Sequence, residues 1–211
     1  MPPETTLAGL ATHIAALPLT PNRRVVALAG PPASGKSTVA QMLADALRTG
    51  GVAAQVVPMD GFHLDDRLLI ADGTRDRKGA PHTFDGAGFL RLIRALQDPE
   101  DVIFPLFDRN HEIAIAGAGR VPAACTTVLV EGNYLLLDQA PWDALREHWS
   151  LSIALHPPRD VLQDRLLKRW DTHGKTRAEA AAWIANNDMP NIETVLTGSV
   201  PADITLYEVP T

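Results

Sequence analysis

The stretch Gly30-Pro31-Pro32-Ala33-Ser34-Gly35-Lys36-Ser37 fits the pattern G-x-x-x-x-G-K-[S/T] at every defined position. Residues 24–29 before it read as a buried strand, and residues 37–48 after it have helical periodicity. A phosphate-binding loop requires this context, because backbone N–H groups and the positive end of the helix dipole cradle the phosphates. The residues predicted to bind a nucleotide are Gly30, Ala33, Ser34, Gly35, Lys36, Ser37 and Thr38. Lys36 should reach the β and γ oxygens and Ser37 should bind Mg²⁺.

The rest of the chain alternates strand and helix patterns around this loop. Apolar residues predict a helix within residues 1–20. Further strands are expected at residues 52–57, 127–130 and 151–155, and further helices at residues 88–96, 160–170 and 178–186. The alternation predicts an α/β P-loop NTPase fold with a mostly parallel sheet and helices on both faces. Residues 61–86 and 110–122 are weakly periodic and are interpreted as long loops, which are usually functional.

Composition limits the classes of function. The 211 residues suit one domain spanning 1–211, and 45% hydrophobic with 21% charged residues is ordinary for a globular protein. The net charge of -6 disfavours nonspecific nucleic-acid binding, which depends on Lys and Arg neutralising phosphates. No window resembles an export signal or a membrane span, so we expect a cytoplasmic protein with no membrane partner. The single cysteine, Cys125, cannot form an internal disulfide.

Two carboxylates follow predicted strands of the sheet. Glu131 ends the apolar run Val128-Leu129-Val130, so it is a candidate metal ligand beside the phosphates, although a glutamate that merely caps the strand fits the same pattern. Asp60 follows the second strand, at the sheet edge where open α/β sheets bind ligands. It could accept a proton from a substrate hydroxyl, or it could be an ordinary Asp-Gly turn residue.

The order of motifs resembles the phosphoribulokinase/uridine kinase group, which includes bacterial pantothenate kinase, and within it the fructose transport system kinases. The segments that carry this resemblance are GPPASGKS at 30–37, MDGFHLDD at 59–66, RKGAPHTFD at 77–85, FPLFDR at 104–109 and VLVEGNYLLLD at 128–138. The resemblance covers roughly residues 20–195 and implies that Asp60 is the catalytic base and that Glu131 belongs to the metal and phosphate site. It also implies an acceptor pocket formed by His82, Phe84, Asp85 and Arg109.

The same resemblance implies a mobile lid at residues 164–173. Arg165 and Arg169 lie one helical turn apart there, where they could bind the nucleotide and neutralise the transferring phosphoryl group, or form only a solvated helix face. His63 could touch the acceptor or be structural. The segment Asn187-Asn191 has no role that the sequence explains.

The combined pattern favours an ATP- and Mg²⁺-dependent kinase acting on a hydroxyl of a small molecule, with Lys36, Asp60 and Arg169 as catalytic residues. A regulatory NTPase or a phosphate-binding protein without turnover remains an alternative, although the guanine-specific N-K-x-D motif is absent. A sugar-like acceptor is expected, with a nucleoside or pantothenate as alternatives. The oligomeric state stays open, and a homodimer is one arrangement that the sequence allows.

Overall fold

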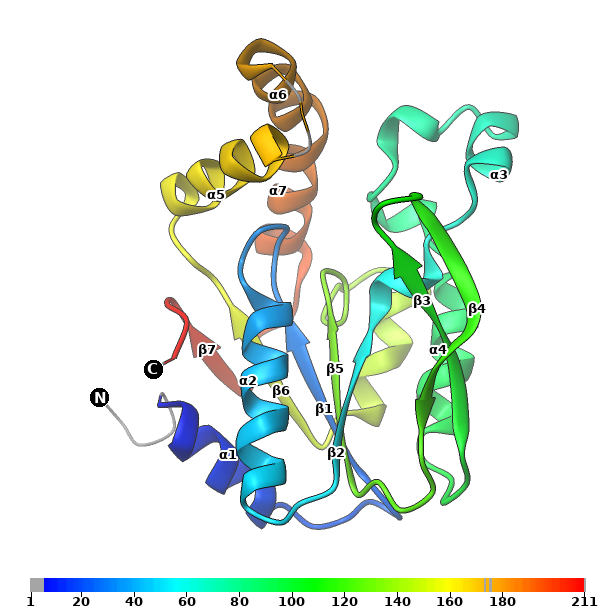
Figure 1. Ribbon diagram of the computed structural model, residues 1–211, viewed down its shortest axis with the longest axis vertical. Coiled ribbons are helices and arrows are strands. Elements are labelled where there is room, and N and C mark those ends of the chain that lie inside the picture. Colours follow the sequence, from blue (N-terminus) through cyan, green and yellow to red (C-terminus); the bar gives the residue numbers. More distant parts are fainter. Residues whose placement is uncertain (1–5, 173, 175, 211) are drawn as a thin grey trace.

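The computed structural model of the protein describes residues 6–172, 174 and 176–210. Its centre is a five-stranded sheet of order β2-β5-β1-β6-β7 in which every pair is parallel (Figure 1). A separate antiparallel ribbon is formed by β3 and β4. The strands are β1 (Arg24–Ala29), β2 (Ala54–Pro58), β3 (Val102–Asp108), β4 (Ile113–Val121), β5 (Thr127–Gly132), β6 (Leu151–Leu155) and β7 (Ile204–Leu206).

Helices cover both faces of the sheet, as the alternating pattern predicted. The α-helices are α1 (Leu7–Ala16), α2 (Lys36–Thr49), α3 (Asp66–Ala71), α4 (Gly86–Ala95), α5 (Arg159–Thr172), α6 (Arg177–Trp183) and α7 (Met189–Gly198). Shorter helical turns are η2 (Met59–Phe62), η3 (Arg75–Arg77), η4 (Pro81–Thr83), η5 (Trp142–His148) and the π-helical η6 (Ile184–Asp188). In Figure 1, α5 and α6 lie above one end of the sheet and the α3 region lies opposite them.

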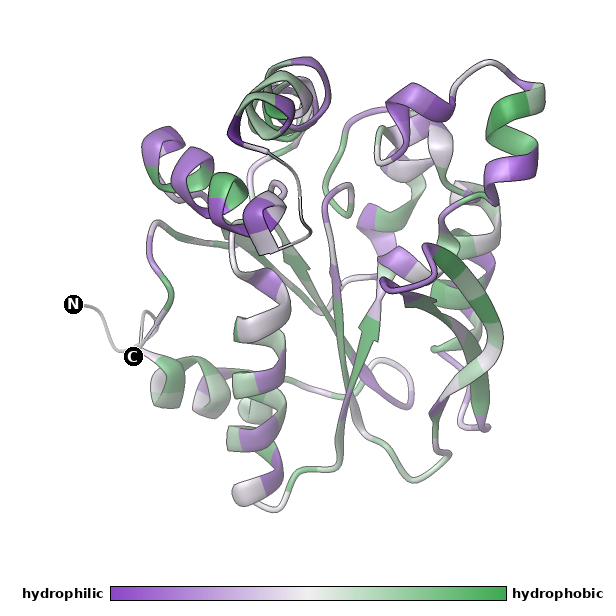
Figure 2. Cartoon of the chain, turned by 45° about the horizontal axis from the view of Figure 1, so that its top comes forward, coloured by the Kyte–Doolittle hydropathy of each residue, from purple (hydrophilic) through white to green (hydrophobic). Residues whose placement is uncertain are grey.

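The side chains of β1 point alternately to the two faces of the sheet and contribute to two separate hydrophobic cores. Val25 and Ala27 belong to a cluster shared with α4 and η5, whereas Val26 and Leu28 belong to a cluster shared with α1 and α2. Successive side chains of a strand point to opposite faces, so an entirely apolar strand needs a helical layer on each side. Figure 2 agrees, because the central strands are predominantly green while the helices above them carry much purple.

Two expectations for the irregular segments need correction. Residues 113–121 form β4 instead of a loop, because their backbone hydrogen-bonding groups pair with those of β3. The alanines and glycines of this segment have low strand propensity, so its sequence gives little sign of a strand. Residues 61–86 are also more ordered than a loop, since they contain α3 and the short turns η3 and η4. No helix in the described part of the chain is long and apolar enough to cross a membrane.

The register of the sheet brings three chain segments to one edge. Ala29 at the end of β1 pairs with Gly132 of β5, and Pro58 at the end of β2 pairs with Glu131. The phosphate-binding loop follows β1 and η2 follows β2. Side chains that are between 24 and 95 residues apart in the sequence, those of Lys36, Asp60 and Glu131, therefore meet at the carboxyl end of the sheet.

The opposite end of β1 is held by a buried arginine. Arg23 is 1% exposed and donates hydrogen bonds at 2.6–3.3 Å to backbone carbonyl oxygens, those of Leu96, Asp98, Glu100, Pro122 and Cys125. One guanidinium group thereby joins residues 96–100 to residues 122–125, and of the five carbonyls that of Pro122 also accepts from the Cys125 N–H at 2.9 Å.

We predict that Arg23→Met destabilises the fold by about 3 kcal/mol or more, because each buried carbonyl left without a donor costs about 1–3 kcal/mol. Urea unfolding followed by circular dichroism measures this change, with the exposed Arg120→Met as the matched control. ATP affinity should be preserved, because Arg23 precedes β1 whereas the phosphate-binding loop follows it. A stability equal to that of Arg120→Met would show that the carbonyls find other donors.

Candidate active site

The loop between β1 and α2 has the backbone geometry of an anion cradle. A Cβ atom on Gly30 would lie 2.7 Å from the Ser34 Oγ and 2.9 Å from the Leu155 carbonyl oxygen, so a larger residue does not fit. Gly35 has φ +95° and Ala33 has φ 64°, both left-handed. No side chain caps the N-terminus of α2, which leaves its first N–H groups open to an anion. Ser37 and Thr38 are exposed on the first turn of α2.

Lys36 is close enough to both predicted carboxylates to interact with them electrostatically. Burial lowers the pKa of Lys36, while the negative charges of Glu131 and Asp60 raise it in part. Glu131 is the second-last residue of β5 and is 6% exposed. Asp60 belongs to η2, directly after β2. The structure therefore brings together the three residues that the sequence placed at separate strand ends.

Asp60 stays ionised because cations surround it. Burial alone would raise its pKa, but Arg109 above all, with Lys36 and Arg169, acts against burial and holds the pKa below that of an ordinary carboxyl group. His63 is not one of these cations at neutral pH, because burial lowers its own pKa. Arg109, directly after β3, donates to the Asp60 carboxylate in a close ion pair. A carboxylate that is ionised at every physiological pH can accept a proton but cannot donate one.

Glu131 has the opposite electrostatic balance. Burial raises its pKa despite the neighbouring Lys36, and a hydrogen bond from Ser37 lowers it in part. The positive charge and the hydrogen bond around the Glu131 carboxylate thus do not fully offset the cost of burying its negative charge. A bound divalent cation would offset the remainder. The Ser37 hydroxyl and the Glu131 carboxylate are oxygen donors of the kind that Mg²⁺ prefers, usually together with phosphate oxygens and water. These two residues fit a Mg²⁺ site.

Arg165 and Arg169 of α5 take different positions. Arg165 Nη1 donates to the carbonyl oxygens of Ala33 and Ser34, at 3.2 and 2.9 Å, and so attaches α5 to the phosphate-binding loop. Arg169 is half-buried, lies 5.6 Å from the Trp170 ring and faces a cavity. Of the predicted lid at residues 164–173, residues 164–172 lie in α5, and His173 is outside the described residues.

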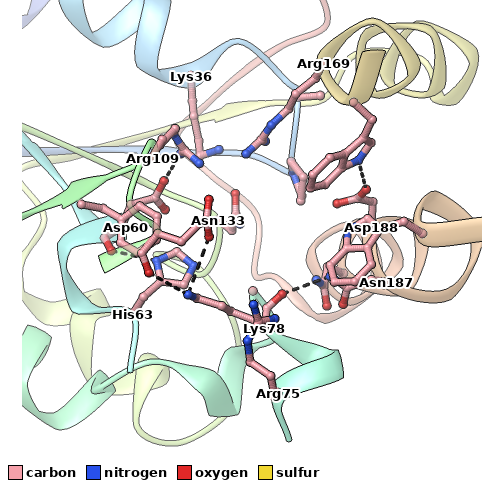
Figure 3. A pocket seen from close by; sticks show the side chains of 18 of the residues that line it. Lys36, Asp60, His63, Arg75, Lys78, Arg109, Asn133, Arg169, Asn187 and Asp188 are labelled. Atoms are coloured by element: carbon pink, nitrogen blue, oxygen red, sulfur yellow. Dashed lines mark hydrogen bonds and ion pairs between the residues drawn. The ribbon is translucent and has the colours of Figure 1, made fainter. Parts of the chain in front are cut away.

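The cavity has a volume of about 500 Å³ and lies between α5, η6 and the turn before η4 (Figure 3). Its charged lining residues are Lys36, Asp60, Arg75, Lys78, Arg109, Glu112, Arg169 and Asp188. Its other polar and aromatic residues are Asn110, Asn133, Asn187, Asn191, His63, Phe107, Trp170 and Trp183. In Figure 3, Lys36 and Arg169 lie at one end and Arg75 and Lys78 at the other, with Asp60, His63 and Asn133 between them.

The predicted acceptor residues separate into two groups. His63 lines the cavity, with its ring centroid 4.0 Å from that of Phe84 and 4.6 Å from that of Phe107. Phe84 is in the hydrophobic core, behind His63. His82 and Asp85 are exposed and do not line the cavity, and the Asp85 carboxylate caps α4 by accepting from the Gly88 N–H at 2.7 Å. Roles for these last three residues in acceptor binding stay predictions.

One side of the cavity, formed by η6 and α7, was not predicted from the sequence. Asn187, Asp188 and Asn191 are between 3% and 7% exposed. Asn187 Nδ2 donates to the Lys78 carbonyl at 3.0 Å, and Asp188 accepts from Trp170 Nε1 at 2.7 Å. The density of amides in residues 187–191 was the available signal, but the π-helical turn that directs them into the cavity has no sequence pattern of its own.

Comparison with known proteins places this chain in a known family. The family model described as "Phosphoribulokinase / Uridine kinase family" matches residues 25–210. The crystal structure of a "putative fructose transport system kinase" from Silicibacter sp. TM1040 is 48% identical and superposes with a TM-score of 0.92, covering 95% of this chain and 98% of that one.

Two curated proteins are also similar over most of their length. The YggC protein of Escherichia coli K12 is 38% identical over 187 residues, 87% of this chain and 78% of its own. A protein of Schizosaccharomyces pombe named as a uridine kinase is 32% identical over 196 residues, 88% of this chain and 83% of its own. With its phosphate-binding loop and parallel sheet, the chain belongs to the phosphoribulokinase/uridine kinase family of P-loop, ATP-dependent kinases.

Proposed function

We propose that the protein transfers the γ-phosphoryl group of ATP to a hydroxyl of a small, sugar-like metabolite in a Mg²⁺-dependent reaction. The observation that carries this proposal is Asp60, an ionised carboxylate at the cavity beside Lys36 of the phosphate-binding loop. A protein that only bound or hydrolysed ATP would not need a proton acceptor facing a cavity of acceptor size.

Each of these residues has a separate role in an in-line phosphoryl transfer. Lys36 and the N–H groups of α2 hold the phosphates, and Arg169 neutralises charge on the moving phosphoryl group. The substrate hydroxyl oxygen bonds to the γ-phosphorus as the bond to the β–γ bridging oxygen breaks, its proton goes to Asp60, and ADP leaves. Mg²⁺ bound at Ser37 and Glu131 would neutralise negative charge on the phosphate oxygens. Asp60 can be a weak base, because the transition state is loose and needs orientation more than basicity.

The sugar-like acceptor is supported by similarity and by the composition of the cavity. The related chain at 48% identity is named as a fructose transport system kinase. The cavity combines amide side chains with the aromatic residues Phe107, Trp170 and Trp183, which is a common environment for hydroxylated ligands. A nucleoside acceptor is the second candidate, because the relative at 32% identity is named as a uridine kinase.

Asp60→Asn tests the proposed base directly. The amide keeps the shape of the carboxylate but cannot accept a proton, so acceptor-dependent ADP release should fall about 10²–10⁴-fold. ATP affinity measured by calorimetry should change little, because the phosphate-binding loop is untouched. Asp72→Asn, an exposed residue at the end of α3, is the matched control. Transfer by Asp60→Asn at the wild-type rate would remove Asp60 from the mechanism.

Arg109→Gln should change how activity depends on pH. The lowered pKa of Asp60 keeps it ionised as the pH falls, so wild-type activity should lose its Asp60-dependent part only below the usual carboxyl range. Without the Arg109 cation the pKa of Asp60 rises, and the acid limb of kcat/KM should move to higher pH.

The pH profile is recorded from about pH 3 to 8 with saturating ATP, so that the wild-type limb falls within the range and a shifted limb is separated from a uniform loss of rate. Arg120→Gln on the neighbouring strand β4 is the matched control. An acid limb at the same pH in Arg109→Gln and wild type would show that Arg109 does not control the ionisation of Asp60.

Glu131→Gln should shift the metal requirement. An amide oxygen is a weaker Mg²⁺ ligand than a carboxylate, so half-maximal activity should need roughly tenfold more Mg²⁺. Turnover is titrated with MgCl₂ at constant ATP, with the exposed Glu147→Gln as control. Superimposable titrations of Glu131→Gln and wild type would mean that Glu131 is not a ligand.

A further inference from the structure

Two amide oxygens in the cavity wall have no hydrogen-bond partner among the described residues. They are Asn133 Oδ1, directly after β5, and Asn187 Oδ1, in η6. Both residues line the cavity, both oxygens are shielded from solvent, and Asn187 as a whole is only 4% exposed. A buried acceptor without a donor costs free energy, so such atoms in a binding cavity indicate where a ligand donates hydrogen bonds.

The amide of Asn187 cannot simply turn over to satisfy its oxygen. Its Nδ2 donates to the Lys78 carbonyl at 3.0 Å, and that bond directs Oδ1 away from the Lys78 backbone. The turn after Lys78 is held from the other side by Tyr134, whose hydroxyl donates to the Gly79 carbonyl at 2.6 Å. The Asn187 oxygen is therefore fixed in place before any ligand binds.

The cations at this end of the cavity are already neutralised. Arg75 and Lys78 pair with the same carboxylate, that of Asp66, at 2.6 and 2.7 Å. Lys78 also lies 3.6 Å from the Glu112 carboxylate and donates to its carbonyl oxygen at 3.0 Å. A carboxylate or phosphate group on the acceptor would have to displace these partners, and it would meet Glu112 in the same wall.

The other lining cations belong to the opposite end or to the proposed base. Arg109 pairs with Asp60. Lys36 and Arg169 lie together at the end formed by the phosphate-binding loop (Figure 3), and both act on the pKa of Asp60. Within the described lining, the acceptor end thus offers hydrogen-bond acceptors and ring faces but no uncommitted positive charge.

We propose that the acceptor is an uncharged polyhydroxy compound whose hydroxyl groups donate hydrogen bonds to Asn133 Oδ1 and Asn187 Oδ1. The inference rests on the proposed kinase function and narrows its substrate class. It excludes acceptors that carry a carboxylate or phosphate group, and it gives both asparagines a role in specificity. The aromatic walls at Phe107 and Trp183 would contact the C–H faces of such a compound.

Matched pairs of acceptors test the class. Acceptor-dependent ADP release is measured with fructose, ribose and glycerol, each against a charged counterpart: fructose 6-phosphate, ribose 5-phosphate and glycerate. The same enzyme is incubated with γ-³²P-ATP and a deproteinised cell extract, and labelled products are identified by mass. We expect the uncharged member of a pair to have at least about tenfold higher kcat/KM, and labelled products to carry no second acidic group.

The outcomes separate this inference from the function on which it rests. Preferential phosphorylation of a charged member, or a labelled product that was acidic beforehand, overturns the uncharged class while the kinase function stands. An enzyme that binds ATP but labels nothing in the panel or the extract overturns the kinase function and the inference together.

Asn133→Ala tests the proposed contact. It should raise the KM for the best acceptor about tenfold without changing the KM for ATP and without lowering the unfolding temperature, because Asn133 Oδ1 has no protein partner to lose. Asn187→Ala should also lower the unfolding temperature, since it removes the bond to Lys78. The adjacent, exposed Asn186→Ala is the control. An unchanged acceptor KM in Asn133→Ala would overturn the assignment of that contact.

Asp66→Asn tests whether the ion pairs of Arg75 and Lys78 exclude negatively charged acceptors. The substitution removes the carboxylate that Arg75 and Lys78 share, so kcat/KM for the charged member of each pair should rise several-fold relative to the uncharged member. The Asp72→Asn variant provides the reference ratio. An identical ratio in Asp66→Asn and Asp72→Asn would show that these ion pairs do not set the substrate class.

Discussion

Parallel pairing of β1, β5 and β2 is the constraint on which the active site depends. The register that places Ala29 beside Gly132 and Pro58 beside Glu131 brings three strand ends to one edge. Every element that continues from those ends then starts beside the others. A slip of one residue in β5 would turn Glu131 to the opposite face of the sheet, so the apolar layers that fix the register also fix the chemistry.

The charged side chains at this edge of the sheet are partly buried, and burial shifts their pKa values. Lys36, Asp60 and Glu131 are all partly removed from water, and burial disfavours the charged form of each. The ion pair with Arg109 counteracts the effect of burial on Asp60, so the Asp60 carboxylate stays ionised. Glu131 has no comparable ion pair among the described residues, and burial raises its pKa. The two carboxylates are thus tuned in opposite directions, which matches a proton acceptor and a metal ligand.

The sequence predicted what depends on local patterns and missed what depends on distant contacts. The loop at residues 30–37, the strand ends at Asp60 and Glu131 and the helical turn that separates Arg165 from Arg169 follow from short-range rules, and the structure has all of them. β4 was missed because its order comes from pairing with β3. The orientation of Asn187 depends on the Lys78 backbone more than 100 residues away in the chain, a contact that no local rule encodes.

The helices above the sheet connect the two halves of the cavity. Leu162 and Leu166 of α5 pack with Ile184 and Ile192 in one small core, against which Ala33 of the phosphate-binding loop also packs. At its α5 side this unit is bonded to the loop through Arg165, and at its η6 side it is bonded to the acceptor wall through Asn187. The packed unit that Arg165 attaches to the phosphate-binding loop therefore also positions the Asn187 oxygen, so the nucleotide end and the acceptor end of the cavity keep a set spacing.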